Sequence, residues 1–449
     1  MNHKLKKLAL VVGDVLILYF SLYLTLLIRY QGGFNAQTWN SHFWPFTMIF
    51  ILWLVIFYIA SLYNLNLAVN NSKFYQMGGR ALAIAGLAAL AFFYLLPQVG
   101  IAPKTNLFIY LLVFATLFFL WRRFYNWSLK SYLPKTNIGI VGYNNLVAEI
   151  IEEFRQKPHL GYSLRFIVDE QARREAPEIK PFSELEKLIS EGKLDAVILS
   201  HDPHQSENLR AALFNCLPYR LNYISLPNFY EAIMGKVPLD SVNQMWFLEN
   251  LNENGKIWFD RLKLVCDFFL ALIVFILTLP VWLIIALIIK LESSGSVFFI
   301  MNRAGRNNRA FKLIKFRTMK ETGNDYAPTR ANDPRITKAG QILRKTRIDE
   351  LPQLLNILKG EMSFVGPRPE RPELVRELEK QIPFYGQRTL VKPGLTGPDQ
   401  VSGEYHSPSR SDSLKKLQYD LFYIKNRSFY LDLSIILKTV ATVISRKGI

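Results

Sequence analysis

Long apolar stretches separated by short polar segments dominate the first quarter of the chain. Four such stretches cover Leu8–Ile28, Pro45–Tyr63, Ala81–Leu96 and Leu107–Trp121. A helix needs about 20 apolar residues to cross the hydrocarbon core of a bilayer, so the last two stretches must extend over polar neighbours. The first is too long for a removable signal peptide and lacks a small-residue cleavage site. The pattern predicts four N-terminal transmembrane helices in a domain over residues 1–134.

Basic residues border these stretches unevenly. Lysines precede the first stretch, Lys73 and Arg80 separate the second from the third, and Arg122 follows the fourth. The loops on the opposite side contain only Arg29 and Lys104. Because cationic loops stay in the cytoplasm, we expect the N-terminus and the chain after residue 121 to face the cytoplasm.

One carboxylate, Asp14, lies about two turns into the first stretch. Ionisable residues inside a membrane are functional candidates by default. Because the neighbouring stretches offer no cation, we expect a structural or interfacial role for this carboxylate.

Short β-branched runs alternate with helical patterns between residues 136 and 226. We expect strands at 137–141, 164–168, 195–199 and 222–226, and helices at 146–155, 183–189 and 206–214. This alternation predicts a Rossmann-like parallel α/β module, which we place at residues 135–250. The first turn, Gly139–Asn144, has fewer glycines than a dinucleotide-binding turn, and only Asp169 at the end of the second strand matches that motif. A ligand-free module is favoured over a nucleotide-binding one, and both interpretations stay open.

A fifth apolar stretch, Phe268–Ile289, is interrupted only by Thr278 and contains Pro280. Basic residues lie on both sides of it, which places both flanks in the cytoplasm. Since proline bends a helix, we expect a re-entrant membrane helix over about residues 262–291. Broken backbone at membrane depth needs shelter, so neighbouring amphipathic helices should cover Pro280. An ordinary kinked fifth span is the alternative.

Composition and charge restrict the class of protein further. The 449 residues include 54 Lys plus Arg against 36 Asp plus Glu, a net charge of +18, and two cysteines. Residues 1–121 carry only seven basic residues and one acid, so the charged part is a separate region. Two cysteines exclude a disulfide framework. Nucleic-acid binding is not supported, because the basic residues lie beside membrane segments rather than in a known reader fold.

Lys315 and Arg317 lie two residues apart in the segment Lys315-Phe316-Arg317-Thr318-Met319. Side chains two apart on an extended segment point the same way, which suits a diphosphate. A basic strand face against anionic lipid is an equally good interpretation.

Two adjacent carboxylates, Asp349 and Glu350, follow a basic run that includes Arg344. The leucines at 351, 354, 355 and 358 form one apolar helix face, and Pro352 is tolerated only in a first turn. The helix should therefore begin near Asp349. Its dipole would stabilise Asp349 as an anion, the form that can attack phosphorus or bind Mg²⁺. Taken alone, the motif favours a helix cap over a catalytic site, because Asp349 is a good capping residue.

Two proline-rich segments follow. In Gly366-Pro367-Arg368-Pro369 the prolines hold Arg368 in an extended turn, which lowers the entropic cost of presenting its guanidinium to phosphate. A plain rigid loop would have a similar sequence. The second segment, Lys392-Pro393-Gly394-Leu395-Thr396-Gly397, precedes a helical C-terminal region. No P-loop, His-Glu-x-x-His or cysteine-based metal pattern occurs in the sequence.

In this combination and order, the four motifs resemble the catalytic domain of the bacterial sugar transferases, the monotopic phosphoglycosyl transferases. The resemblance covers Arg261–Ile449 most clearly. With four spans and a Rossmann-like module ahead of it, the whole chain resembles the long-form hexose-1-phosphate transferases. The fold expected is a membrane protein of mixed α and α/β class whose mainly α catalytic domain, residues 251–449, is anchored by the re-entrant helix.

The resemblance implies a reaction and a set of site residues. Asp349 would attack the β-phosphorus of a UDP-sugar, releasing UMP, and undecaprenyl phosphate would then take the sugar phosphate. Glu350, with Asp349, would hold Mg²⁺, while Lys315, Arg317, Arg344 and Arg368 would bind phosphates. Membrane lipid and a homodimer are further expected partners, and the expected location is the bacterial inner membrane with the catalytic domain in the cytoplasm.

The chain departs from the family pattern at several positions. Leu279 precedes Pro280 where some members have serine, and Pro398 and Asp399 stand where an aromatic residue is usual. Glu404 replaces an arginine. Sugar preference is therefore left open. Two alternatives remain: a glycosyl transferase that releases UDP, and a catalytically silent scaffold of a polysaccharide assembly complex.

Overall fold

The chain divides into two compact units, Met1–Phe229 and Tyr230–Ile449. The computed structural model describes residues 3–63, 72–95, 103–131, 135–156, 160–169, 179–200, 206–251, 254–320, 333–402 and 409–445. The second unit begins at Tyr230 rather than at residue 251, because residues such as Val237 and Trp246 pack into its core.

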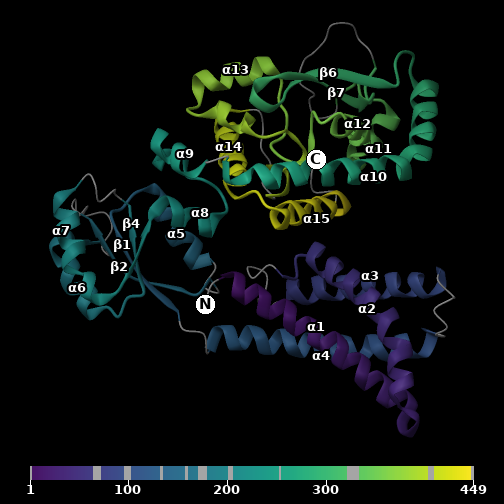
Figure 1. The fold of residues 1–449 in the computed structure, drawn as a ribbon, viewed down its shortest axis with the longest axis horizontal. Coiled ribbons are helices and arrows are strands. Elements are labelled where there is room, and N and C mark those ends of the chain that lie inside the picture. The colour runs from purple at the N-terminus through teal and green to yellow at the C-terminus, as the bar shows by residue number, and fades with distance from the viewer. Residues whose placement is uncertain are drawn as a thin grey trace. The chain divides into compact units, whose positions relative to one another are not determined.

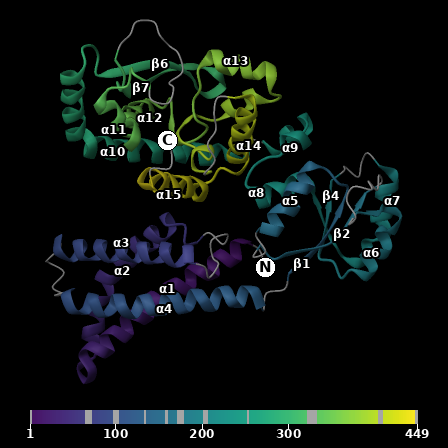
Figure 2. The same ribbon diagram turned by 180° about the vertical axis from the view of Figure 1, so that it is seen from behind.

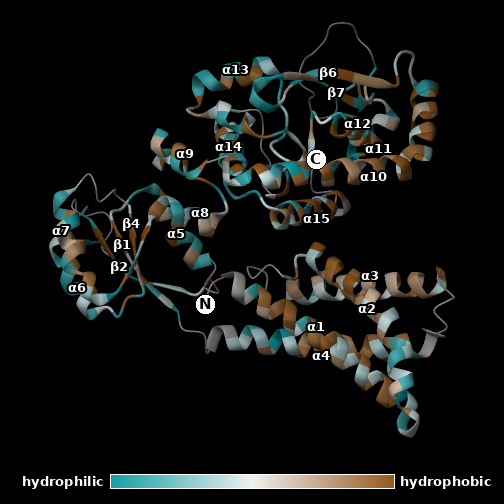
Figure 3. Cartoon of the chain, in the orientation of Figure 1, coloured by the Kyte–Doolittle hydropathy of each residue, from teal (hydrophilic) through white to brown (hydrophobic). Residues whose placement is uncertain are grey.

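Four long helices open the first unit: α1 (His3–Tyr30), α2 (Ala36–Ile59), α3 (Ser72–Leu95) and α4 (Pro103–Ser131). They are apolar along most of their length (Figure 3). Among the described residues, five helices are long and apolar enough to cross a membrane, these four and α10 (Ile257–Glu292). The third and fourth stretches extend over polar neighbours as predicted, giving apolar segments of 22 and 23 residues.

An ion pair inside this helical region corrects one prediction. Arg122 Nη2 donates to Asp14 Oδ2 at 2.5 Å, with both side chains buried. Arg122 also donates to the Leu62 carbonyl at 2.9 Å, and its guanidinium lies over the rings of Tyr63 and Phe118. The expectation that Asp14 has no cationic partner was wrong, because Arg122, taken as a flanking cytoplasmic charge, points back into the helices.

The parallel α/β module follows as predicted. Its sheet has the order β3-β2-β1-β4-β5, with neighbouring strands parallel. The strands are β1 (Thr136–Val141), β2 (Tyr162–Asp169), β3 (Ile179–Pro181), β4 (Ala196–Leu199) and β5 (Asn222–Ser225). The helices are α5 (Asn145–Gln156), α6 (Leu185–Glu191), α7 (Glu207–Asn215) and α8 (Leu226–Met234). The short strand β3 had no counterpart in the sequence prediction.

The first turn of this module uses its backbone donors internally. Asp169 accepts a hydrogen bond from the Tyr143 amide at 3.0 Å, and Asn144 Oδ1 accepts from the Val147 amide at the start of α5. A side chain at Gly139 would collide with the Phe166 ring, so this glycine serves packing. Since the amides of Tyr143 and Val147 are already bonded to side chains of the module, fewer donors remain for a pyrophosphate, which favours the ligand-free interpretation.

The second unit is built around α10 and a set of short elements (Figures 1 and 2). After α9 (Gln244–Asn250) and α10 come an antiparallel hairpin of β6 (Phe298–Ala304) and β7 (Ala310–Phe316) and a two-stranded parallel sheet of β8 (Ser363–Val365) and β9 (Gly394–Thr396). The helices are α11 (Lys338–Thr346), α12 (Leu354–Leu358), α13 (Pro372–Gln381), α14 (Arg410–Asn426) and α15 (Phe429–Ser445). This part is mainly helical, as expected.

Helix α10 is 36 residues long, contains Pro280, and changes direction along its course (Figure 1). Because Pro280 has no amide hydrogen, the Ile276 carbonyl loses its helical donor. Near the bend, Thr278 Oγ1 donates to the Val274 carbonyl at 2.7 Å and accepts from Trp282 Nε1 at 3.2 Å. The expected cover over Pro280 is absent from the described part of the chain, where Pro280 is exposed; the hydrogen bonds come instead from within the helix.

Candidate active site

The two adjacent carboxylates lie in the first turn of a 3-10 helix, Ile348–Gln353, which leads directly into α12. The helix begins within one residue of the predicted start, and Leu354 packs in the core beneath it. Arg347 precedes it with a left-handed backbone (φ 59°) and provides no side-chain cap. Asp349 makes no capping hydrogen bond, so its interpretation as a helix cap was wrong.

Glu350 is the centre of a cluster of cations. Its Oε1 atom lies 2.9 Å from Arg368 Nη2, 3.4 Å from Arg347 Nη1 and 3.5 Å from Lys315 Nζ. Burial alone would raise the pKa of Glu350, but these cations hold it well below its usual range. Glu350 is therefore an anion at neutral pH, and it holds three positive side chains beside Asp349.

Asp349 is buried, and its Oδ1 atom has no hydrogen-bond partner in the described structure. Burial and the adjacent Glu350 charge raise the pKa of Asp349, while Lys315, Arg344 and Arg347 act in the opposite direction. Burial is the largest of these effects, so the net shift of the pKa disfavours the anion that the sequence leads us to expect here. A buried polar atom without a partner is costly, so this oxygen is available to a ligand.

The loop that carries Arg368 is held between the two short strands. The Gly366 amide donates to the Thr396 carbonyl, and the Gly394 amide donates to the Pro367 carbonyl. A side chain at Gly394 would meet the Gly366 amide nitrogen at 2.2 Å, so only glycine permits this approach. The two proline-rich segments, separated in sequence, thus form one rigid support for Arg368.

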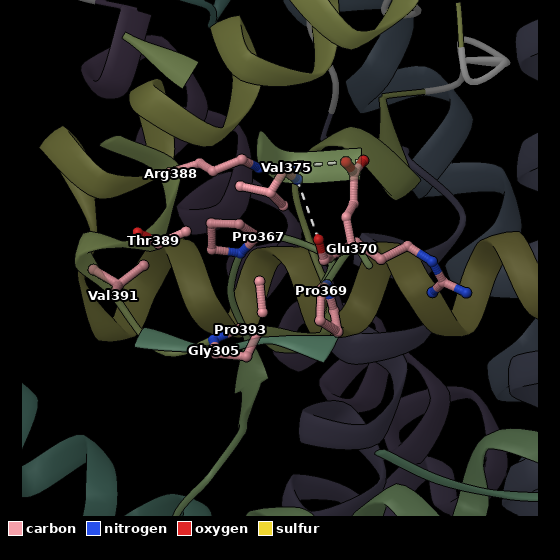
Figure 4. Close-up of a pocket in the computed structure, with 11 residues that line it drawn as sticks. Gly305, Pro367, Pro369, Glu370, Val375, Arg388, Thr389, Val391 and Pro393 are labelled. Atoms are coloured by element: carbon pink, nitrogen blue, oxygen red, sulfur yellow. Dashed lines mark hydrogen bonds and ion pairs between the residues drawn. The ribbon is translucent and has the colours of Figure 1, made fainter. Parts of the chain in front are cut away.

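Arg388 also holds the loop that carries Arg368. Its guanidinium binds Asp420 at 2.8 Å and Glu370 at 3.1 Å, and it donates to the Arg368 carbonyl at 3.1 Å. Tyr385 completes the network by donating to Glu370 at 2.7 Å. Figure 4 shows Arg388 and Glu370 directed toward each other beside a pocket lined by the prolines of the loop. These contacts make Arg388 a positioning residue for Arg368.

The other predicted phosphate-binding residues have different surroundings. Lys315, on β7, faces Glu350 as stated above, and burial lowers its pKa. Arg344 donates to Thr318 Oγ1 at 2.8 Å and lies within electrostatic range of Asp349. Arg317 instead donates to the carbonyls of Ser293 and Ser294 at 2.9 and 2.7 Å. Its contacts support the end of α10 rather than a phosphate site.

Sequence reasoning missed three residues of this cluster: Arg347, Arg388 and Arg303. Arg347 adjoined the recognised motif, but its left-handed backbone could not be foreseen. Arg303, on β6, was counted only among the basic residues after the apolar stretch. Its guanidinium donates to the Pro369 carbonyl at 3.3 Å, so it belongs to the same site.

Asp349 and Glu350 are the residues that could hold a magnesium ion. Mg²⁺ in phosphate-transfer sites usually takes one or two carboxylates and completes its coordination with water and substrate phosphates. The unpartnered Asp349 Oδ1 fits this arrangement. No group of three or more His, Cys, Asp or Glu side chains with metal-binding geometry occurs among the described residues, so the fit is to a metal shared with a phosphate ligand.

Comparison with known proteins agrees with this geometry. Residues 258–446 match the family model described as "Bacterial sugar transferase". A UDP-glucose:undecaprenyl-phosphate glucose-1-phosphate transferase of Xanthomonas campestris pv. campestris is 31% identical over 325 residues, covering 69% of this chain and 67% of the relative. The chain belongs to the bacterial sugar transferase family.

Two further relatives show how far the similarity extends. A Klebsiella pneumoniae UDP-glucose:undecaprenyl-phosphate glucose-1-phosphate transferase is 27% identical over 445 residues, 95% of this chain and 93% of the relative. An Aeromonas hydrophila UDP-N-acetylgalactosamine-undecaprenyl-phosphate N-acetylgalactosaminephosphotransferase is 37% identical over 245 residues. That match covers 53% of this sugar transferase chain and only 55% of the Aeromonas protein.

One departure from the family pattern adjoins the site. Pro398 and Asp399 follow Gly397, where an added Cβ would lie 3.8 Å from the Arg368 amide nitrogen. The charge of Asp399 acts on Arg368, so this carboxylate lies in the electrostatic field of the phosphate-binding cluster. Glu404 lies outside the described residues.

Proposed function

We propose that the protein transfers a sugar 1-phosphate, a hexose 1-phosphate, from a UDP-sugar to undecaprenyl phosphate. The transfer passes through a covalent phosphosugar on Asp349 and releases UMP. Such a reaction would initiate the assembly of a surface polysaccharide. The names of the Xanthomonas, Klebsiella and Aeromonas relatives, all sugar-phosphate transferases that act on undecaprenyl phosphate, support this assignment.

The observation that carries the proposal is the environment of Asp349. Its Oδ1 atom is buried and unpartnered, and Lys315, Arg344 and Arg347 surround it with positive charge. A cation cluster that exceeds the two carboxylates in charge favours a polyanionic substrate. A carboxylate left open within it has the arrangement that a nucleophile for phosphorus requires.

In the first step, an oxygen of the Asp349 carboxylate forms a bond to the β-phosphorus of the donor. The bond between that phosphorus and the bridging oxygen breaks, and UMP leaves with the electron pair. Arg368 and Lys315 neutralise charge on the phosphoryl oxygens, while Glu350 keeps both side chains in place. Lys315, Arg344 and Arg347 favour the anionic form of Asp349 against the effect of burial, and a metal held beside it would act in the same direction.

In the second step, a phosphate oxygen of undecaprenyl phosphate attacks the phosphorus of the phosphosugar. The acyl phosphate bond breaks and the Asp349 carboxylate is regenerated. Splitting the transfer in two allows a soluble donor and a lipid acceptor to use one site in turn. Mg²⁺ held by Asp349 and Glu350 would supply further neutralisation of the diphosphate.

The test uses radiolabelled UDP-sugars, Mg²⁺ and the purified full-length protein without lipid acceptor. The wild type should release UMP and retain label on the chain, whereas Asp349→Asn should do neither. Asp240→Asn, the same chemical change at an exposed aspartate, should behave as wild type. UDP as the product would support a simple glycosyl transferase, and full activity of Asp349→Asn would refute the assigned nucleophile. Absence of turnover with any donor would favour a scaffold.

We also propose that the protein lies in the bacterial inner membrane, with α1 to α4 as spans and α10 as a re-entrant helix that keeps the catalytic unit in the cytoplasm. Exposed apolar side chains along α10, such as Leu277, Leu283 and Leu291, support burial in lipid. Single cysteines at Trp258 and Ser294, in a chain lacking Cys216 and Cys266, would test the topology. A membrane-impermeant maleimide should label both from the cytoplasmic side; labelling from opposite sides would show that α10 spans the membrane.

A further inference from the structure

Arg303 is a partly buried cation that forms no ion pair with a described carboxylate. Its guanidinium donates to the Pro369 carbonyl at 3.3 Å, and its Nε and Nη2 atoms lie 3.3 and 3.2 Å from the Met301 sulfur. A thioether is a weak acceptor. The charge of Arg303 is thus poorly compensated by the chain itself, unlike the charges of Lys315 and Arg368, which contact Glu350.

The surroundings of Arg303 are themselves cationic. Burial, together with the charges of Arg368 and Arg371, lowers the pKa of Arg303 to about 10, while Glu370 and Glu350 act more weakly in the opposite direction. The guanidinium therefore stays protonated at neutral pH. A desolvated cation without a counter-ion is costly to keep in a folded protein, so an anionic ligand would relieve the cost.

The backbone fixes Arg303 at this place. The next residue, Ala304, donates its amide to the Glu370 carbonyl at 2.9 Å, which joins the end of β6 to the loop that carries Arg368. Two guanidinium groups, one from a strand and one from a proline-clamped loop, are therefore presented to the same region. Each guanidinium group can bind two oxygens of a phosphate at once, a bidentate contact that a lysine cannot reproduce.

We propose that Arg303, together with Arg368, forms a subsite for a phosphomonoester group next to the phosphoryl group that Asp349 attacks, so that Arg368 contacts both groups. This inference rests on the proposed function, which provides two phosphomonoesters: the nucleoside monophosphate that leaves and the polyprenyl phosphate that arrives. Both molecules carry a dianionic phosphate group that is attached through a single ester oxygen.

Equilibrium binding to the full-length protein tests the subsite without turnover. UMP and a short-chain polyprenyl phosphate are titrated against wild type, Arg303→Gln and Arg303→Lys, with uridine and the matching polyprenol as phosphate-free probes. Arg309→Gln is the matched control, because Arg309 lies on the same hairpin and is exposed. Arg303→Gln should weaken binding of a phosphomonoester by about tenfold to a hundredfold, whereas Arg309→Gln should change it less than about twofold.

The outcomes separate the two sources. If Arg303→Gln weakens the binding of UMP alone, the subsite belongs to the leaving group. If it weakens the binding of the polyprenyl phosphate alone, the subsite belongs to the acceptor. Binding of both within about twofold of wild type, or an equal loss with uridine and polyprenol, would overturn the proposal. If Arg303→Gln does not fold, Arg303→Lys decides by the same criteria, since it keeps the charge but loses the guanidinium fork. Asp349→Asn should keep Arg303-dependent binding, so failure of the covalent mechanism would be seen separately.

Discussion

Replacing Glu350 by glutamine should destabilise the catalytic unit and change the titration of Asp349. One carboxylate oxygen compensates Arg368, Arg347 and Lys315. Removing one partner of a buried ion pair costs about 3–5 kcal/mol. Because the Arg368 and Arg347 side chains are 37% and 39% exposed, water compensates part of that loss, and we expect about 2–3 kcal/mol.

For a unit of this size, that loss lowers the thermal midpoint by about 4–12 °C. Glu373→Gln, at an exposed glutamate, is the control and should cost less than about 1 kcal/mol. Since the cations lower the pKa of Glu350 in the folded state, its stabilisation is complete above the ordinary pKa of a glutamate. It is lost as the pH falls toward the folded-state value, so the difference between wild type and Glu350→Gln should shrink in acid.

The same variant changes the chemistry of Asp349. Burial is the main cause of the raised pKa of Asp349, and the Glu350 charge is the next. Only the anion attacks phosphorus, so the rate of covalent labelling should fall at low pH, and this acid limb should move to lower pH in Glu350→Gln. The maximal rate should also fall by about a hundredfold or more. Melting curves equal to the Glu373→Gln control, together with an unmoved acid limb, would refute the assigned role of Glu350.

Three other changes test separate parts of the fold. Asp14→Asn and Arg122→Gln should each destabilise the membrane helices by about 3–5 kcal/mol, and the double variant should lose less than the sum in melting curves; additive losses would contradict a direct pair. Arg388→Lys cannot bridge both Asp420 and the Arg368 carbonyl, so the donor KM should rise about tenfold with little change in kcat; an unchanged KM would exclude a positioning role. Thr278→Val leaves the Trp282 indole without an acceptor and should lower the free energy of unfolding in chemical denaturation by about 1–2 kcal/mol, whereas Thr278→Ser should be close to wild type.

The sequence located the carboxylates well because their signals are local. Pro352 and the leucine spacing place a helix start near Asp349, and the structure has the start at Ile348. The long apolar stretches and the alternating strand and helix patterns likewise depend on neighbouring residues, so the helices and most strands of the parallel sheet were found.

Contacts between distant segments could not be predicted in the same way. Arg317 follows the last residue of β7, and its long side chain reaches Ser293 and Ser294 instead of a phosphate site. Arg122 was assigned to the cytoplasmic surface by its position, yet it reaches Asp14. A long, flexible cationic side chain can face a ligand or the surface, or it can bind another part of the chain. Only the three-dimensional arrangement decides between these roles.

Helix α10 connects the proposed membrane anchor to the chemistry through polar contacts on its inner face. Asp267 accepts a hydrogen bond from Ser363 at 2.6 Å at the start of β8, and β8 leads into the loop that presents Arg368. Lys263 contacts Asp432 at 2.5 Å on α15, and the two helices lie side by side (Figures 1 and 2).

The far end of the same helix is held from the opposite direction. Arg317 binds the Ser293 and Ser294 carbonyls and follows directly on β7, which carries Lys315. Glu292 accepts from the Lys338 amide at 2.6 Å at the start of α11. The segments of α10 before and after Pro280 are thus both bonded to elements that position the cations around Glu350. If α10 enters the membrane as proposed, the depth of its insertion also fixes the distance of the phosphate-binding side chains from the lipid surface. A lipid-linked phosphate could then meet Asp349 without a large movement of the enzyme.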